Sequence, residues 1–178
     1  MSTRSLTHVR ETENGHDILC IYRQGDGYPE GMGTDLVKAI GGYKIVNGIG
    51  GNDGTCAVCN EYHFMHKPSE KIDHDFKPKR VANGLGCLAA FLVVALKDCV
   101  GSVYIYKPNS KDVGEQYEYY LWVNGKAEFG KEPPKLMLKI VQSGCAYEGY
   151  KRDPKILYSG PLDDFDAAKI QAEEEAEA

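Results

Sequence analysis

In this chain of 178 residues, the feature that most constrains the fold is the order of the β-type and helical sequence patterns. Two β-type runs, 5–11 and 17–24, surround Asn14-Gly15, a dipeptide typical of hairpin turns. Helical patterns follow at 34–40 and 87–98, and the chain then carries further β-type runs at 102–107, 115–123, 126–129, 134–142 and 155–160. Long β–α–β alternation is missing. This order predicts an α+β fold, with an antiparallel sheet and helices packed on one face.

The length and composition favour one globular domain. We expect it to cover 1–162, with a small insert at 51–80 and an acidic segment at 163–178 that begins as a helix capped by Asp163 or Asp164. The longest apolar run, "CLAAFLVVAL", falls short of the roughly 18 residues of a membrane span and suits a helix buried on most sides. The opening "MSTRSLTHVR" lacks the apolar run of a signal peptide, so the cysteines are predicted to be reduced, in the cytoplasm.

The charge is unevenly placed along the chain. The net charge is −5, and residues 163–178 carry seven acidic residues and one lysine, or −6, which leaves +1 for the rest. A nearly neutral body argues against binding duplex nucleic acid, which normally needs a basic surface. The acidic segment suits a frayed helix end that aids solubility, with a partner-binding arm as the alternative.

One glycine-rich phrase is written twice, as "IVNGIGG" at 45–51 and "VANGLGC" at 81–87. Asn-Gly accepts positive φ, and the later glycine lets another group approach the backbone closely. The second copy runs into a helix, so Gly84 and Gly86 lie beside amides that attract anions. Asn47 and Asn83 are candidate ligand-binding residues on the two copies. The alternative is that the glycines only allow a tight turn into the core.

The loop "YRQGDGYPEGMG" concentrates further candidates. Arg23 can clamp an anion, Asp26 can accept a hydrogen bond from a hydroxyl or amine, and Tyr28 can stack on a flat ligand. The alternative is a tight turn in which Asp26 bonds its own backbone and Tyr28 covers the edge of the core.

A Cys/His cluster separates the two glycine-rich copies. "CAVCNEYHFMH" places two thiols and two imidazoles at a spacing that suits tetrahedral zinc, namely Cys56, Cys59, His63 and His66. His74 is an alternative fourth ligand. Such a site is structural, since four protein ligands leave no open position for chemistry. The competing interpretation is a polar excursion with incidental Cys and His residues.

Cys87 is a weak candidate nucleophile because a thiol at a helix start has a lowered pKa. A cysteine hydrolase also needs a nearby histidine, and no histidine follows Cys87 in the sequence. His8 would have to reach it across the sheet. A structural cysteine is the favoured interpretation.

Four stretches together resemble a set of uncharacterised small proteins of tailed bacteriophages. They are "YRQGDGYPEGMGTDL", "KIVNGIG", "VANGLGCLAA" and "GEQYEYYLWV". The resemblance covers most of residues 3–50 and 81–123 and carries over no catalytic residue. It implies a viral accessory protein that acts in the host cytoplasm.

Three hypotheses follow, in this order. The first is a non-catalytic binding protein for a small anionic or nucleotide-like ligand, held by the candidates of the loop and of the two phrases. The second is an adaptor that binds a host protein through the zinc knuckle or through aromatic strands such as "YEYYLWV". The third is a hydrolase that uses Cys87.

Overall fold

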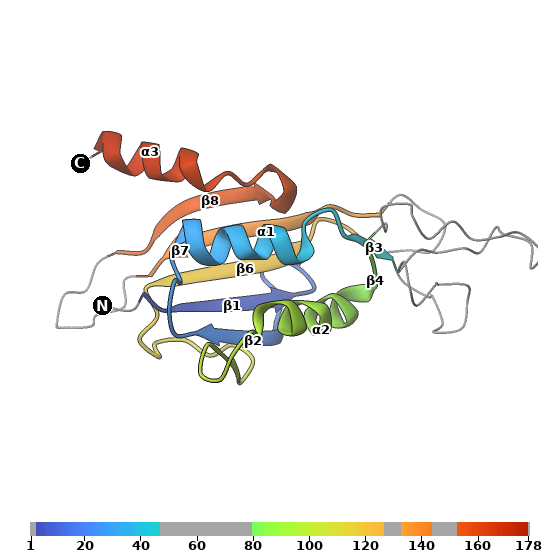
Figure 1. The fold of residues 1–178 in the computed structure, drawn as a ribbon. Coiled ribbons are helices and arrows are strands. Elements are labelled where there is room, and N and C mark those ends of the chain that lie inside the picture. Colours follow the sequence, from blue (N-terminus) through green and yellow to red (C-terminus); the bar gives the residue numbers. More distant parts are fainter. Residues whose placement is uncertain (1–2, 47–79, 127–132, 144–152, 178) are drawn as a thin grey trace, which may run out of the picture.

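The computed structural model describes residues 3–46, 80–126, 133–143 and 153–177 (Figure 1). Within these ranges it has α+β architecture, with helices and a larger and a smaller sheet. The elements are, in order, β1 (Ser5–Arg10), β2 (Asp17–Arg23), η1 (Pro29–Gly33), α1 (Thr34–Ile40), β3 (Lys44–Val46), β4 (Val81–Asn83), α2 (Gly84–Leu96), β5 (Val103–Tyr106), β6 (Tyr117–Val123), β7 (Leu136–Gln142), β8 (Lys155–Pro161), η2 (Leu162–Asp164) and α3 (Ala167–Glu177). The predicted α+β class and opening hairpin are confirmed. The β-type run at 126–129 lies outside the described residues from residue 127 onward.

The larger sheet has the strand order β5-β2-β1-β6-β7-β8 among the described residues. Neighbouring strands run antiparallel except β1 and β6, which run parallel and make the sheet mixed. A parallel pair cannot be joined by a tight hairpin and needs a long crossover connection. Here the connection between β1 and β6 contains β2, α1, α2 and β5.

The helices supply side chains to one core against one face of the larger sheet. Strand residues such as Val9, Tyr119 and Leu138 are fully buried there, beneath Leu36 of α1 and Leu88 of α2. Helix α3 adds Ile170 to the same core. Figure 1 shows α1 and α2 lying across the sheet on the same side. The predicted placement of the helices on one face is therefore confirmed.

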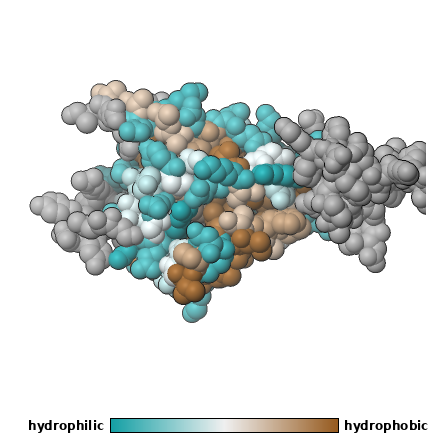
Figure 2. Space-filling model, in the orientation of Figure 1, coloured by the Kyte–Doolittle hydropathy of each residue, from teal (hydrophilic) through white to brown (hydrophobic). Residues whose placement is uncertain are grey.

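Helix α2 differs from the predicted helix in its start and in its burial. It begins at Gly84, because the glycine-rich phrase itself forms the first turn. One face packs on the core, while Val94 on the other face is 77% exposed. Figure 2 shows apolar side chains gathered over α2 on this side of the molecule. None of the helices described has both the length and the apolar character that a membrane crossing requires.

The helix caps also differ from the prediction. Helix α3 begins at Ala167, and Asp166 accepts a hydrogen bond from the amide of Ala168 at 3.1 Å. Asp163, a predicted cap, instead accepts a hydrogen bond from the amide of Gly42 at 2.7 Å, just past the end of α1. The short helix η2 thus links the end of the sheet to α1 before α3 starts.

The hydroxyl of Tyr119 provides a test of the central strand. The ring is fully buried, and its hydroxyl donates to the carbonyl of Gly27 at 2.8 Å. Tyr119→Phe leaves that carbonyl without its donor, and we expect the free energy of unfolding to fall by about 1–2 kcal/mol. Urea denaturation measures the change. Tyr104→Phe is the matched control. Tyr104 is 44% exposed, so water can hydrogen-bond to any group that loses the Tyr104 hydroxyl. Equal losses in both variants would contradict this role of Tyr119.

Candidate functional site

The two copies of the glycine-rich phrase meet in space. Strands β3 and β4 pair in parallel, with Ile45 beside Ala82 and Val46 beside Asn83. The remainder of the first copy, including Asn47, lies outside the described residues. The second copy turns into α2 at Gly84, whose φ of 74° is the left-handed conformation that favours glycine.

A cavity of about 560 Å³ opens beside the start of α2. Its polar lining comes from the turn after β1 and the segment after β6, and its apolar lining comes from four elements. The polar residues are Glu11, Thr12 and Lys126, and the apolar residues are Ile18, Ile45, Leu85 and Val123. The volume lies within the range typical of small-molecule sites, as does the mixture of apolar wall and few polar groups.

Gly84 and Gly86 expose their backbone in this cavity. A Cβ built on either glycine meets no atom of the described residues within 4 Å. The N-cap residue, Asn83, makes no side-chain capping bond, and the first turn of α2 has no acidic residue. The positive end of the α2 dipole therefore faces the cavity, and no carboxylate in the first turn of α2 neutralises it.

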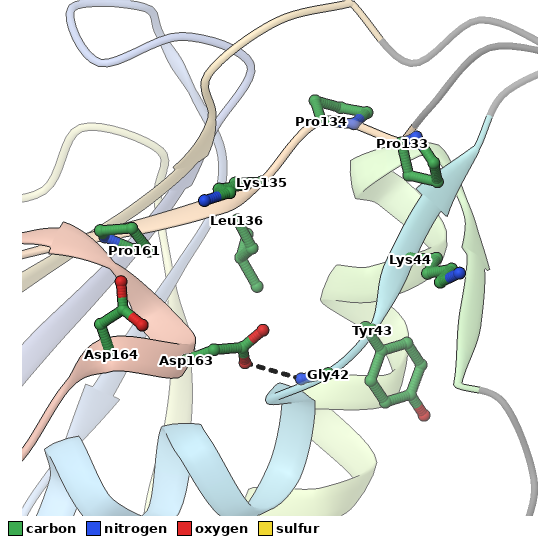
Figure 3. Close-up of a pocket in the computed structure, with 10 residues that line it drawn as sticks. All are labelled: Gly42, Tyr43, Lys44, Pro133, Pro134, Lys135, Leu136, Pro161, Asp163 and Asp164. Atoms are coloured by element: carbon green, nitrogen blue, oxygen red, sulfur yellow. Dashed lines mark hydrogen bonds between the residues drawn. The ribbon is translucent and has the colours of Figure 1, made fainter.

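A second cavity, of about 380 Å³, lies where the segment after α1 approaches β7 and the end of β8 (Figure 3). Leu136 points into it, and Lys44, Lys135, Asp163 and Asp164 balance one another in charge. The amide of Gly42 is already bonded to Asp163 at this site. The backbone amide that an anion could use here is therefore already occupied by a carboxylate.

The loop candidates make internal contacts. Arg23 donates to Asp35 at 2.6 Å and to the carbonyl of Gly25 at 2.8 Å, which ties β2 to the first turn of α1. Asp26 adopts a positive φ of 53°. Tyr28 is partly exposed at the start of the π-helical turn η1 and makes no side-chain capping bond.

The structure places these loop candidates far from Gly84 and Gly86. Arg23 ends β2 and pairs with Ser5, whereas Ile18, at the other end of β2, lines the cavity beside α2. At about 3.3 Å per strand residue, the five steps from Ile18 to Arg23 span roughly 16 Å. Arg23, Asp26 and Tyr28 therefore do not converge with Gly84 and Gly86 on one cavity, and the described lining of that cavity does not include Asn83.

The remaining sequence candidates divide into two cases. Cys56, Cys59, His63 and His66, with the alternative His74, lie outside the described residues. Cys87 packs against the core on the helix side, whereas His8 shares the opposite face with its strand partner Cys20. The sheet separates Cys87 from His8, so the two do not form a nucleophile–base pair.

A buried polar cluster on the face without helices was not predicted from the sequence. It consists of His8, Asp17 and Cys20, whose potential ligand atoms lie within 4.8 Å of one another. The register of β1 and β2 shifts between Val9 and Arg10, which pairs Arg10 with Asp17 and skips Ile18. This bulge turns Asp17 toward His8, because an extra residue reverses the alternation of side chains. Such a group can hold a metal ion.

Asp17 is the centre of the cluster. One carboxylate oxygen lies 2.6 Å from Nδ1 of His8 and accepts the amide of Asn109 at 2.5 Å, and the other accepts Nε of Arg10 at 2.6 Å. Burial alone would raise the pKa of Asp17, but the hydrogen bonds from Arg10 and His8 outweigh it and the pKa lies below its usual value. Asp17 is therefore ionised.

Cys20 is not activated by its neighbours. Burial raises its pKa to about 12, and the negative charge of Asp17 adds to the effect. The thiol is fully buried and protonated in the metal-free protein. It therefore does not act as a nucleophile in this state.

Aromatic and acidic side chains close the cluster on its outer side. Tyr120 stacks on the ring of His8 with centroids 4.8 Å apart, and the guanidinium of Arg10 lies 4.3 Å from the Tyr120 centroid. The Tyr120 hydroxyl donates to Glu118 at 3.0 Å, and burial raises the pKa of Tyr120. The same Glu118 oxygen is 3.9 Å from Nε2 of His8, and within the part of the chain that the structure describes Nε2 has no hydrogen-bond partner.

Comparisons with protein families, curated proteins and solved structures found no match to this chain.

The Asp17 network predicts a pH-dependent contribution to stability. We expect Asp17→Asn to lower the free energy of unfolding by about 3 kcal/mol near neutral pH, because Arg10 then lacks its buried partner. The folded-state pKa of Asp17 is depressed, so its contribution is complete above the unfolded pKa of about 3.9 and is lost as the pH falls through the folded pKa. Urea denaturation over a pH series measures this.

The exposed Asp153 supplies the matched control. Asp153→Asn is expected to change the free energy of unfolding by less than about 0.5 kcal/mol at every pH. A loss in Asp17→Asn that stays constant into strong acid would show that the carboxylate charge is not its source.

Proposed function

We propose that this protein is a non-catalytic binding protein that holds a small anionic or nucleotide-like ligand in the cavity beside Gly84 and Gly86. The observation that carries the proposal is the exposed backbone of these glycines at the uncapped start of α2. Helix-start amides and the helix dipole together favour a phosphate or carboxylate group.

The rest of the cavity supports a ligand with an apolar part next to its anionic part. Lys126 adds a positive charge, and Thr12 adds a hydroxyl. Ile18, Leu85 and Val123 supply an apolar wall against which a flat ring can pack. Glu11 is the one acidic residue of the described lining, and it can accept hydrogen bonds from ring amines or sugar hydroxyls.

Two features favour this function over the alternatives. Cys87 lacks the strand histidine that a hydrolase would need, since His8 faces the other side of the sheet. The strand with "YEYYLWV" is β6, which pairs with β1 and β7 and so offers no free edge to a partner. An adaptor role would therefore depend on the zinc knuckle proposed at Cys56, Cys59, His63 and His66.

The resemblance to tailed-bacteriophage proteins supports the proposal that this binding takes place in an infected host cell. In that setting the protein is an accessory factor made during infection, and its ligand is a small metabolite of the host cytoplasm. Zinc in the 51–80 insert would order that insert and take no part in binding the anion.

A variant at Gly86 tests the proposal. Gly86→Asp places a carboxylate at the ligand's anionic position, and we expect it to weaken nucleotide or pyrophosphate binding more than tenfold by charge repulsion. The same carboxylate stabilises the unliganded helix by about 0.3–1 kcal/mol through the dipole. Calorimetric titration with ATP, GTP and pyrophosphate measures binding, and thermal denaturation measures stability.

Gly86→Asn is the matched control, with the same shape and no charge. We expect it to retain most of the affinity, because no described residue lies within 4 Å of a Cβ at this position. A ligand at a hundredfold excess over its Kd stabilises the native state by about 2.7 kcal/mol, which is readily detected. No stabilisation by any of the three compounds, or equal weakening in both variants, would overturn the proposal.

A further inference from the structure

The ring of His8 lies between two carboxylates on the face of the sheet without helices. Its Nδ1 is 2.6 Å from Asp17, and its Nε2 is 3.9 Å from Glu118. The side chain is only 2% exposed, and Nε2 has no hydrogen-bond partner among the described residues. This environment is separate from the cavity beside Gly86.

A neutral imidazole cannot satisfy both carboxylates. With its proton on Nδ1 it donates to Asp17 and turns the lone pair of Nε2 toward Glu118. With its proton on Nε2 it turns the lone pair of Nδ1 toward the Asp17 oxygen at 2.6 Å. A metal ion bound to Nδ1 would let the ring carry its proton on Nε2, on the side of Glu118.

We infer that His8, Asp17 and Cys20 form a binding site for a divalent metal ion of the zinc class. Imidazole, carboxylate and thiolate are the three side-chain ligand types of zinc, and their atoms already lie within 4.8 Å of one another. A thiolate among the ligands selects zinc, cobalt or cadmium over magnesium or calcium.

The groups around the cluster fit the outer shell of such a site. A metal-bound histidine normally donates its other ring N–H to a carboxylate, and Glu118, whose oxygen lies 3.9 Å from Nε2, would take this role once the two atoms move within hydrogen-bonding distance. The hydroxyl of Tyr120 holds Glu118 at 3.0 Å. Arg10 bonds one oxygen of Asp17, and the other oxygen, which lies beside His8 and accepts the amide of Asn109, would be the one that binds the metal.

The charges also favour a divalent ion. Asp17 belongs to the cluster, Glu118 lies beside His8, and Glu115 is near enough to raise the pKa of the Cys20 thiol. Arg10 is the cation bonded to Asp17, so these four groups sum to −2 while the ring and the thiol are neutral. When the ion binds, the Cys20 thiol releases its proton to solvent and the ring proton moves from Nδ1 to Nε2. The sum then becomes −1.

Cobalt titration of the full chain tests the site, with Cys56→Ser/Cys59→Ser as the background. That background removes the thiols predicted for the insert and leaves Cys20. After metal is stripped with a chelator, we expect added Co²⁺ to bind at one equivalent, with the near-ultraviolet charge-transfer band of a single thiolate. Adding Cys20→Ala should abolish the band, and Glu118→Gln should weaken binding about tenfold.

Cadmium NMR of the unmutated chain is a second readout that survives if Cys20→Ala fails to fold. A site with one sulfur, one nitrogen and one oxygen ligand gives a chemical shift distinct from that of a site with two sulfurs. The absence of a one-sulfur signal, or a cobalt band that persists in folded Cys20→Ala, would overturn the inference.

Discussion

The parallel pairing of β1 with β6 is the contact on which the described structure depends. It is the one pairing that joins the amino-terminal hairpin to β6, β7 and β8 within the larger sheet. Because parallel neighbours need a long connection, the chain between them has room for α1 and α2, which cover one face. The same pairing sets His8 beside Tyr120 on the opposite face, so the core and the buried polar cluster have a common origin.

Much of the fold follows from local patterns in the sequence. Alternation and Asn14-Gly15 predict the hairpin, and the strands at 103–106, 117–123, 136–142 and 155–161 lie within or close to the predicted runs. These patterns report which segments are extended or helical, since side-chain periodicity is a local property. They do not report which strands pair over long distances, so β1 beside β6 could not be predicted from them.

The buried cluster shows why register is the harder problem. A two-residue turn at Asn14-Gly15 would pair His8 with Ile21 and set Cys20 on the other face of the sheet. The structure has a longer turn, closed by the Gly15 amide on the Thr12 carbonyl, and pairs His8 with Cys20. A bulge then brings Asp17 to the same face. Each step shifts the register by one residue, and nothing in the local composition specifies either step.

The part of the candidate ligand site that is formed by residues adjacent in the sequence was predictable. Gly84 and Gly86 precede an apolar helix in the sequence, and helix starts expose amides wherever they occur. The role of Arg23 was not predictable in this way. An arginine in a glycine-rich loop can pair with a carboxylate of its own chain as readily as it can bind an anionic ligand. Its partner, Asp35, is twelve residues away, so only the folded chain shows that the guanidinium is engaged.

The bulge in β2 connects the two proposed sites. It leaves Ile18 in the lining of the cavity beside α2 and turns its neighbour Asp17 into the cluster on the other face. Glu11 and Thr12 of the same cavity directly follow Arg10, which bonds Asp17. A metal ion on Asp17 would therefore fix the local backbone that carries three residues of the cavity lining. The two proposed sites therefore share one short stretch of backbone, although they lie on opposite faces of the sheet.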